Sequence, residues 1–307
     1  MAVLQLIVIG LGAGLIGGML GVGGSIVMIP AMTEVLGPDQ HLYQAAAMMV
    51  NFFVVVPAVY QHSRARAIDK ATVARIVPLA VAGVIVGVGV SELPVFASEG
   101  EVYLRGLFGL FLLVVGVSDL IRLRRSAEVA EPLLPETTSS GGMIRRIGWS
   151  DAALVAVPTG FVAGLFGVGG GLLAVPLQHR FLRMPIRTAI ANSAAVIIAT
   201  SLIGAFLKNY AYLSRNMHWE TSFILAAVLI PTAIIGSSTG SRLTHRLPTR
   251  AIKFAFLVLL IGAAARLTYK ASQSIAQQGR AAQVLRSHTS WTEMERHTGC
   301  VLVQLSG

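Results

Sequence analysis

A glycine-interrupted hydrophobic segment occurs twice in this chain. The seventeen residues Gly14–Pro30, GLIGGMLGVGGSIVMIP, return 146 positions later as Gly160–Pro176, GFVAGLFGVGGGLLAVP. Seven positions are identical, including the whole tetrapeptide Gly-Val-Gly-Gly. Each glycine weakens a helix by roughly 1 kcal/mol relative to alanine, and a glycine cluster leaves backbone N–H groups free to contact other groups. Matched, glycine-broken segments in the two halves of a chain are typical of the binding site of a membrane transporter.

Long apolar runs predict an all-α polytopic protein of the cell (plasma or inner) membrane. Hydrophobic residues make up 54% of the chain and charged residues 12%, about half the usual share in a soluble domain. Roughly 20 apolar residues span a hydrocarbon core of about 30 Å. The first run lacks a preceding basic region, so we expect no cleavable signal peptide. The hydrophobic segments lie near residues 3–33, 42–61, 72–96, 102–121, 151–179, 187–207, 220–241 and 251–269.

Two polar stretches divide the chain. Residues 122–150 contain two prolines and the sequence Thr-Thr-Ser-Ser-Gly-Gly, which is typical of a flexible linker. Residues 270–307 carry glutamines, serines and scattered charges without a sustained apolar face. We therefore predict a first membrane repeat over 1–121, a linker over 122–150, a second membrane repeat over 151–269 and a polar tail of no assigned function over 270–307.

Basic residues concentrate in the predicted loops. The net charge is +10, but cytoplasmic loops of membrane proteins retain Lys and Arg, so we interpret this charge as a sign of orientation rather than of nucleic-acid binding. In the first half, the basic loops are Gln61–Arg75 and the linker, which we place inside. In the second half, the basic residues lie near 180–187, in a loop containing Lys208 and Arg215, and near 242–253.

Two arrangements of the second half fit these charges. If segment 151–179 crosses the membrane, two of the basic loops of this half fall outside, against the usual tendency. If this segment and its counterpart each enter and return as a hairpin of half-helices, each half has three full spans and one re-entrant hairpin. An odd number of crossings then inverts the second half. The Lys and Arg counts are 16 against 8 either way. We favour the inverted repeat, because segments of about 30 residues exceed a single span.

The glycine clusters are candidates for anion binding. Where a broken helix restarts, its first N–H groups have no acceptor within the helix and lie at the positive end of the helix dipole. Such an end can hold a small oxyanion without a buried arginine. The residues at the two restarts are Gly23, Gly24 and Ser25, and Gly169, Gly170 and Gly171. Close helix packing is the alternative. We favour packing for the small residues upstream, which comprise Gly10, Gly14, Gly18, Gly160 and Gly164.

Polar side chains on the next segment of each half are further candidates. A carboxamide inside an apolar segment is costly without a partner, so Asn51 and Asn192 must bind a helix, the backbone or a substrate. Ser193 follows Asn192 directly and joins the candidate substrate-binding residues. Thr200 and Ser201 are weaker candidates, because such side chains commonly bond to their own helix.

Other chemistries have less support. A GxGxxG sequence at Gly12–Gly17 lacks the alternating strands and helices of a dinucleotide-binding fold. The single cysteine, Cys300, excludes an intramolecular disulfide and a cysteine-cluster metal site. No carboxylate lies clearly in the middle of a span, so an acidic proton relay is not evident. We therefore predict no enzyme activity, no metal and no cofactor.

The paired Gly-Val-Gly-Gly motifs, each preceded by a small-residue helix and followed by a proline, resemble the sulfite exporter TauE/SafE family of membrane permeases. The resemblance covers about residues 5–270, leaving out the linker and tail. It implies a protein of two related halves that transports sulfite, an organosulfonate or a related small anion. The family often has a Thr-Ser pair on the second segment after each motif, where this chain has Val50-Asn51 and Asn192-Ser193.

Together, these patterns predict a permease that moves a small, sulfur-containing anion by alternating access around the paired half-helix ends. Its expected partners are that anion and the lipid bilayer, with no nucleic acid, and the oligomeric state is left open. The alternatives are an anion channel and a structural membrane protein without transport. Uptake that saturates with concentration distinguishes a transporter from a channel, and a structural protein shows no ligand-dependent change.

Overall fold

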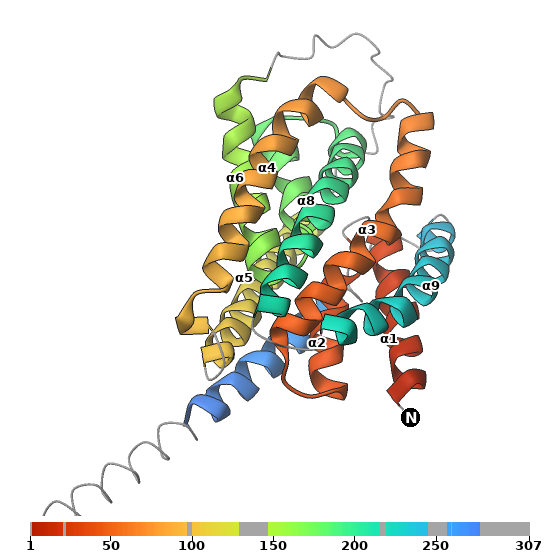
Figure 1. Ribbon diagram of the computed structural model, residues 1–307. Helices are drawn as coiled ribbons and strands as arrows, with labels where there is room; N and C mark the ends of the chain where they lie inside the picture. The colour runs from red at the N-terminus through yellow and green to blue at the C-terminus, as the bar shows by residue number, and fades with distance from the viewer. Residues whose placement is uncertain are drawn as a thin grey trace, which may run out of the picture.

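The computed structural model describes residues 2–20, 23–96, 100–128, 147–214, 219–244, 257–258 and 260–276. All secondary structure within these ranges is helical (Figure 1), which confirms the predicted all-α fold. A helical segment over 260–276 follows the labelled elements. These elements are α1 (Ala2–Leu20), α2 (Ser25–Val35), α3 (Gln40–Arg64), α4 (Lys70–Ser91), η1 (Pro94–Phe96), α5 (Glu101–Glu128), α6 (Trp149–Phe166), α7 (Gly171–Phe181), α8 (Ile186–Ser214) and α9 (Trp219–Thr244).

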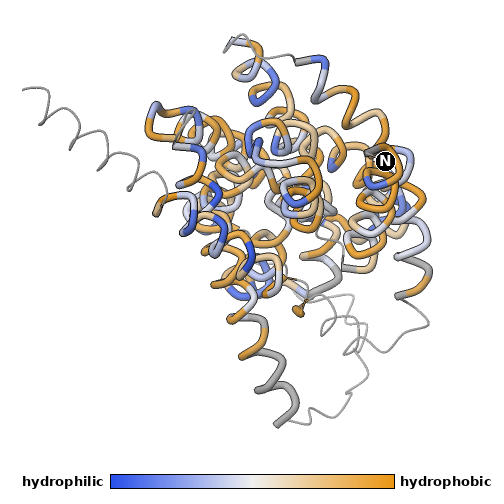
Figure 2. The backbone as a smooth tube through the Cα atoms, turned by 90° about the horizontal axis from the view of Figure 1, so that it is seen from below, coloured by the Kyte–Doolittle hydropathy of each residue, from blue (hydrophilic) through white to orange (hydrophobic). Residues whose placement is uncertain are grey.

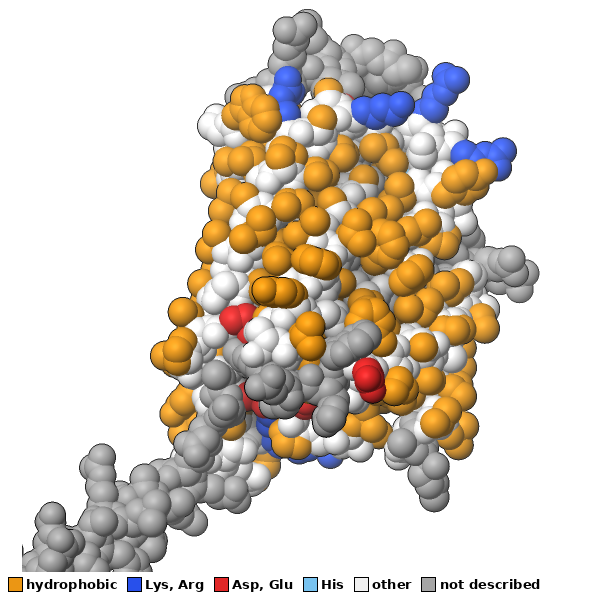
Figure 3. All heavy atoms as spheres, viewed as in Figure 1, with side chains coloured by type: hydrophobic (Ala, Val, Ile, Leu, Met, Phe, Trp, Pro, Cys, Tyr) orange, Lys and Arg blue, Asp and Glu red, His pale blue; other side chains and the backbone are white. Residues whose placement is uncertain are grey.

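The outer surface of the bundle is apolar. Six of the described helices, α3, α4, α5, α6, α8 and α9, are long and apolar enough to cross a membrane. Hydrophobic residues recur along the helices (Figure 2). Their side chains cover the middle of the molecule in Figure 3, while Lys and Arg side chains gather at its upper end. Large side chains such as Val86, Phe206 and Ile224 are more than half exposed, at 57%, 70% and 63%. Exposed apolar area of this extent fits a lipid-facing surface.

Each glycine-broken segment forms a helical hairpin. A Cβ atom on Gly24 would lie 3.0 Å from the carbonyl oxygen of Ala13, so α2 folds back along α1. A Cβ atom on Gly170 would lie 2.9 Å from Cγ2 of Thr159, so α7 folds back along α6. Both returning helices have 11 residues, about 16 Å of helix, which is too short to span the hydrocarbon core. The glycine-broken helices predicted from the sequence are therefore present.

The two halves repeat the same order of elements. The offset of 146 residues between the motifs carries Ser25–Val35, which is α2, onto Gly171–Phe181, which is α7. It likewise relates α1 to α6, α3 to α8, and α4 to α9. The main helix contacts repeat with the halves exchanged, because α1 packs along α9, α6 packs along α4, and α3 packs against α8. The inversion of one half relative to the membrane stays a prediction.

Small residues make the contacts between the halves close. A Cβ atom on Gly14 or Gly18 of α1 would overlap backbone atoms of α9, at Ala233 and Ser237. A Cβ atom on Gly160 of α6 would in the same way overlap the backbone of α4. The packing role predicted for these upstream glycines is therefore confirmed, and it follows the small-residue pattern of membrane helix interfaces.

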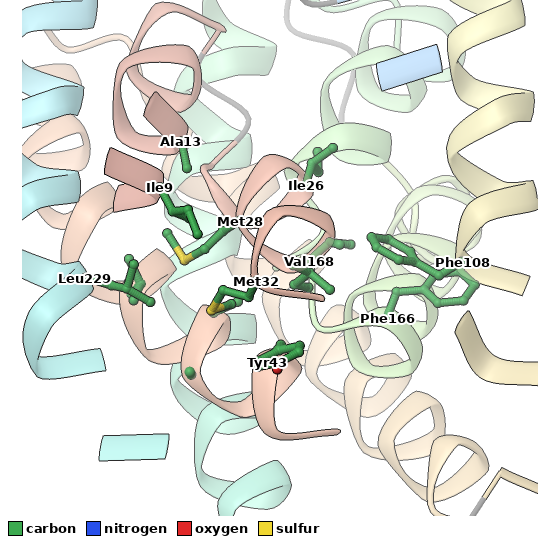
Figure 4. Close-up of a cluster of buried hydrophobic side chains, with 14 of the residues drawn as sticks. Ile9, Ala13, Ile26, Met28, Met32, Tyr43, Phe108, Phe166, Val168 and Leu229 are labelled. Carbon is green, nitrogen blue, oxygen red and sulfur yellow. The ribbon is translucent and has the colours of Figure 1, made fainter. Parts of the chain in front are cut away.

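One hydrophobic core joins both halves. Figure 4 shows part of it, with Ile9, Ile26 and Met32 from the first half and Phe166 and Val168 from the second. All five side chains are at most 9% exposed. The loop between α1 and α2 and the loop between α6 and α7 are called the glycine loops below. Because both loops lie among these residues, the core fixes the position of the two hairpins relative to each other.

Three predicted boundaries differ from the structure. Helix α5 continues to Glu128, beyond the predicted start of the linker at 122. The last described helix continues to residue 276, beyond the predicted start of the tail at 270. Helix α8 continues to Ser214, so Lys208 lies in a helix and not in a loop. In each case the helix extends one or two turns past the end of the apolar run. Lys208 and Lys270, in two of these extensions, contact neighbouring helices through Gln44 and Glu34.

Candidate functional site

Glycine in left-handed conformations interrupts both hairpins. Gly23 has a φ of 89°, and Gly167, Gly169 and Gly170 have φ values of 70°, 72° and 82°. Residues with a side chain pay roughly 1–2 kcal/mol each in the left-handed region, whereas glycine enters it readily. These four positions therefore require glycine for the backbone to turn within a few residues.

The two returning half-helices begin without a capping side chain. Their N-cap residues are Gly24 for α2 and Gly170 for α7, and neither offers a side-chain acceptor. The helices that follow ordinary loops differ, since Asp39 accepts from the Leu42 N–H at the start of α3 at 2.9 Å and Asp69 caps α4. The first N–H groups of α2 and α7 thus lack the acceptor that an N-cap supplies, and they lie at the positive ends of the helix dipoles.

The two glycine loops meet, and Asn51 of α3 lies between them. The Ser25 hydroxyl, at the start of α2, donates a hydrogen bond to the Val168 carbonyl oxygen at 3.1 Å. Asn51 Nδ2 donates to Ser25 Oγ at 2.8 Å. A Cβ atom on Gly23 would lie 3.0 Å from Asn51 Oδ1, and one on Gly169 would lie 2.9 Å from Asn51 Nδ2. One buried carboxamide therefore contacts both loops.

Helix α8 contributes two hydroxyl groups to the second loop. Thr200 Oγ1 donates to the Gly169 carbonyl oxygen at 2.9 Å. A Cβ atom on Gly169 would lie 2.9 Å from Ser201 Oγ. Ser201 Oγ and Asn51 Oδ1 are both fully buried, and neither has a hydrogen-bond partner within the described part of the chain. Buried polar atoms are rarely left unpaired, so these two atoms have hydrogen-bonding capacity that the described part of the chain does not use.

The structure brings most of the predicted site residues together. Those at or between the loops are Gly23, Gly24, Ser25, Asn51, Gly169, Gly170 and Gly171. Ser201, considered only a weak candidate above, joins them. Nothing in the sequence distinguished Ser201 from serines that bond to their own helix, because its role depends on where α8 meets the second loop.

Asn192 and Ser193 lie elsewhere. Asn192 Oδ1 accepts from the backbone N–H of Asp69 at 2.9 Å, where it holds the start of α4. Ser193 Oγ accepts from Gln178 Nε2 of α7 at 3.0 Å. Asn192 precedes Ser201 by nine residues of α8, about 13 Å along the helix. The structure therefore does not bring these two predicted ligands to the glycine loops, and it gives each of them a contact that fastens neighbouring helices.

A buried ionic cluster at Lys208 was missed in the sequence. Lys208 is 2% exposed, and its Nζ donates to Gln44 Oε1 at 2.6 Å and to the Ser91 hydroxyl. The same Nζ lies 3.4 Å from Glu92 Oε1, and His41 Nδ1 lies 3.2 Å from that oxygen. The predicted loop position of Lys208 is therefore wrong. The apolar and aromatic residues that follow it, up to Leu213, were the signal that the helix continues.

Asp39 lies at the same end of the bundle as this cluster, just before α3. Its Oδ2 accepts a hydrogen bond from the Tyr212 hydroxyl at 3.1 Å. Burial raises the pKa of the Asp39 carboxyl above its ordinary value, while the hydrogen bond from Leu42 N–H acts in the opposite direction. Glu101 adds a further, smaller increase to this pKa by like-charge repulsion.

Comparison with known proteins agrees with this architecture. The model of the sulfite exporter TauE/SafE family matches residues 6–267. The chain belongs to this family. It is 27% identical over 288 residues to the probable membrane transporter protein MamO of Paramagnetospirillum magneticum, which covers 86% of this chain and 44% of MamO. It is 23% identical over 283 residues to the probable membrane transporter protein YunE of Bacillus subtilis, covering 88% and 98% of the two chains.

A third relative, a probable membrane transporter protein of Xylella fastidiosa, is 29% identical over 252 residues, or 80% of this chain and 87% of the relative. The chain spans less than half the length of the MamO proteins, 44% of each. No solved structure matches it. Family membership and the six helices long and apolar enough to cross a membrane identify this TauE/SafE family member as a multi-pass membrane protein, similar to relatives that are named probable membrane transporters.

Proposed function

We propose that this TauE/SafE family member is a permease for a small oxyanion, with sulfite or an organosulfonate as the substrate class, that works by alternating access. The observation that carries the proposal is the meeting of two uncapped half-helix ends at Asn51. The positive ends of α2 and α7 lie at loops that touch through Ser25 and Val168. The first N–H groups of α2 and α7 find no acceptor in an N-cap side chain. An oxyanion between the two ends supplies acceptors to both at once.

Neutral donors suit a substrate that must also leave. The polar side chains at the loops include Ser25, Asn51, Thr200 and Ser201, and none of these four carries a charge. Main-chain N–H groups and helix dipoles attract an anion without the ion pair that a buried lysine or arginine would form with it. The Asn51 amide and the unpartnered Ser201 hydroxyl add donors from the sides, since a half-helix end donates from one direction only.

The sulfur-containing substrate is supported by the family, whose model carries the name sulfite exporter. Sulfite and sulfonates present three oxygens around one sulfur, so they accept hydrogen bonds from several directions. Alternating access is supported by the fold, because each half contributes one hairpin to the site and small residues line the contacts between the halves. A repeat architecture of this kind allows one half to move against the other around a central site.

Transport by purified variants in liposomes tests the proposal. Gly169→Leu places a side chain where the loop approaches Asn51 and Ser201. We expect uptake of radiolabelled sulfite to fall at least about tenfold, since each charge-assisted hydrogen bond to the anion contributes about 1.5–3 kcal/mol. Gly12→Leu is the matched control, because a Cβ atom on Gly12 would meet nothing within 4 Å. Normal uptake by folded Gly169→Leu would reject the site.

The substrate class is tested separately by thermal stability. A ligand that binds the native protein raises its melting temperature in proportion to the logarithm of ligand concentration over Kd. Purified protein is therefore compared in sulfite, sulfate, thiosulfate, sulfoacetate and a small carboxylate. We expect the largest shift with sulfite or sulfoacetate, and saturable uptake of the same anion. Uptake that rises linearly with concentration would favour the channel alternative.

A further inference from the structure

Lys208 is a buried cation that the glycine-loop site does not use. Its side chain is 1% exposed, in a helix long and apolar enough to cross the membrane. An ionisable group at such a position is costly to bury and commonly marks a substrate or ion pathway. Lys208 follows Ser201 by seven residues on α8, and Gln44 precedes Asn51 by seven residues on α3. Seven residues are two helical turns, about 10.5 Å.

The packed helices α3 and α8 therefore carry two polar layers at the same spacing. One layer is Asn51 with Ser201, at the glycine loops. The other is Gln44 with Lys208, where Gln44 Oε1 accepts from Lys208 Nζ at 2.6 Å. Gln44 also contacts the second loop, since a Cβ atom on Gly167 would lie 2.6 Å from Gln44 Cβ. The Gln44 Nε2 donor is buried and has no partner within the described ranges.

A flexible apolar side chain, Met48, lies between the two layers. Met48 of α3 is fully buried, and a Cβ atom on Gly204 of α8 would overlap its sulfur. Both residues lie between the layers in sequence and along the helices. An unbranched thioether changes rotamer more readily than a branched or aromatic side chain, so this contact separates the layers without a rigid barrier.

The carboxylate that neutralises Lys208 lies on its outer side. The Glu92 side chain is 19% exposed, against 1% for Lys208. Glu92 is also the C-cap residue of α4, where the negative end of the helix dipole disfavours a carboxylate and favours the lysine. His41 Nδ1, at 3.2 Å from Glu92 Oε1, offers this carboxylate a second partner.

We propose that Lys208 and Gln44 form a second anion-binding site on the transport path, called the second station below. The proposal rests on the proposed function. The oxyanion leaves the glycine loops past Met48 and takes the place of the Glu92 carboxylate at Lys208 Nζ, with the Gln44 Nε2 amide as an added donor. Glu92 then stays on His41. In the present structure, Glu92 Oε1 occupies the place of the substrate oxygen at 3.4 Å from Lys208.

Anion binding to charge-neutralised variants tests this station. The probe is sulfite, and its Kd is measured by calorimetry on purified full-length protein. Glu92→Gln removes the competing carboxylate and keeps the lysine, so we expect sulfite to bind about tenfold tighter and to be transported more slowly. Lys208→Gln removes the cation, and we expect binding about tenfold weaker. If Glu92→Gln does not accumulate, Glu92→Asp replaces it. We expect Glu92→Asp to bind sulfite more tightly than the wild type, because its shorter side chain reaches Lys208 less well.

The ion pair between Lys270 and Glu34 provides a matched control. Its Nζ–Oε2 distance is 2.8 Å, and it joins α2 to the last described helix. We expect Lys270→Gln and Glu34→Gln to leave the sulfite Kd unchanged. If the wild type binds sulfite and both Glu92→Gln and Lys208→Gln bind it with the same Kd, the second station alone is overturned. The pair of Glu92 and Lys208 would then be structural. A wild type that binds no sulfite would overturn the proposed function together with the station.

Discussion

At the scale of single residues, Asn51 is the side chain on which the two halves converge. It contacts Ser25 through Nδ2 at 2.8 Å, and both Gly23 and Gly169 approach it closely enough that a Cβ atom would touch its amide. Its Oδ1 is buried without a partner within the described residues. A side chain with this combination of burial and incomplete hydrogen bonding is costly to keep for packing alone. The residue therefore provides the sharpest test of anion coordination.

Asn51→Asp is expected to lose anion binding more severely than Asn51→Ala. The change replaces an N–H₂ donor by an acceptor, and the ionised carboxylate also repels the anion. We expect a Kd for sulfite at least tenfold weaker than in Asn51→Ala at neutral pH, with partial recovery in acid as the carboxyl takes up a proton. Titration calorimetry at several pH values measures this. Asn192→Ala serves as the control, since Asn192 contacts the Asp69 N–H and its loss should change stability but not Kd. Equal affinity of both Asn51 variants at every pH would make Asn51 a packing residue.

The sequence was sufficient for some residues and not for others. Asn51 and the glycines could be predicted, because an amide in an apolar run and a glycine cluster are both costly and require a reason. Asn192 has the same chemical signal, yet its partner is a backbone N–H of another helix, and only the packing of α8 on α4 reveals this. Lys208 was assigned to a loop because lysine usually marks the end of a span. Its burial depends on Gln44, Ser91 and Glu92, which lie more than 100 positions away in sequence.

At the scale of elements, helix capping separates the two kinds of helix start. The N-cap residues of α3 and α4 are Asp39 and Asp69, whose carboxylates accept from the first N–H groups of these helices. The N-cap residues of α2 and α7 are the glycines Gly24 and Gly170, and neither helix has a side-chain cap. A side-chain cap contributes about 1 kcal/mol, so its absence from both glycine-broken segments is a cost that the proposed anion would offset when bound.

Asp39→Asn is expected to raise stability at neutral pH. Burial raises the pKa of the Asp39 carboxyl above its unfolded value of 3.8, so the native state binds this proton more tightly than the unfolded state does. Stability is then greatest below the unfolded pKa and falls as pH rises through the folded pKa. Asparagine keeps an acceptor for the Leu42 N–H but does not ionise. We expect the melting temperature at pH 7 to rise by about 2–4 °C for each kcal/mol of relieved cost, and the gap from wild type to close below about pH 3.8. A variant that is less stable at pH 7 would show that the Tyr212 contact outweighs burial.

At the scale of the whole molecule, the internal repeat determines more than any single motif. The offset of 146 residues relates α2 to α7 and α3 to α8, and the contacts of α1 with α9 reappear as those of α6 with α4. The order of elements could therefore be predicted from the duplication. The contact partners could not, because packing across the halves depends on which faces carry small residues. Both hairpins return toward the end at which they began, and each half then has three further helices. Three crossings after a re-entrant hairpin would invert the second half, which is the arrangement that the length of the glycine-broken segments favours.

Cysteine labelling decides whether the second half is inverted. Because α7 folds back along α6, the loop after α7 lies at the same end of the hairpin as the start of α6, to which the linker leads. In a Cys300→Ser background, Arg183→Cys, Arg246→Cys and Ser140→Cys should therefore react with a membrane-impermeant maleimide from one face. Positions 140 and 246 lie outside the described residues, and Arg183 lies just after α7. Pro38→Cys, in the loop between α2 and α3, is the control and should react only from the opposite face. Reaction at position 183 from the face that labels position 38 would mean that the α6–α7 segment crosses the membrane, and the inverted repeat would be rejected.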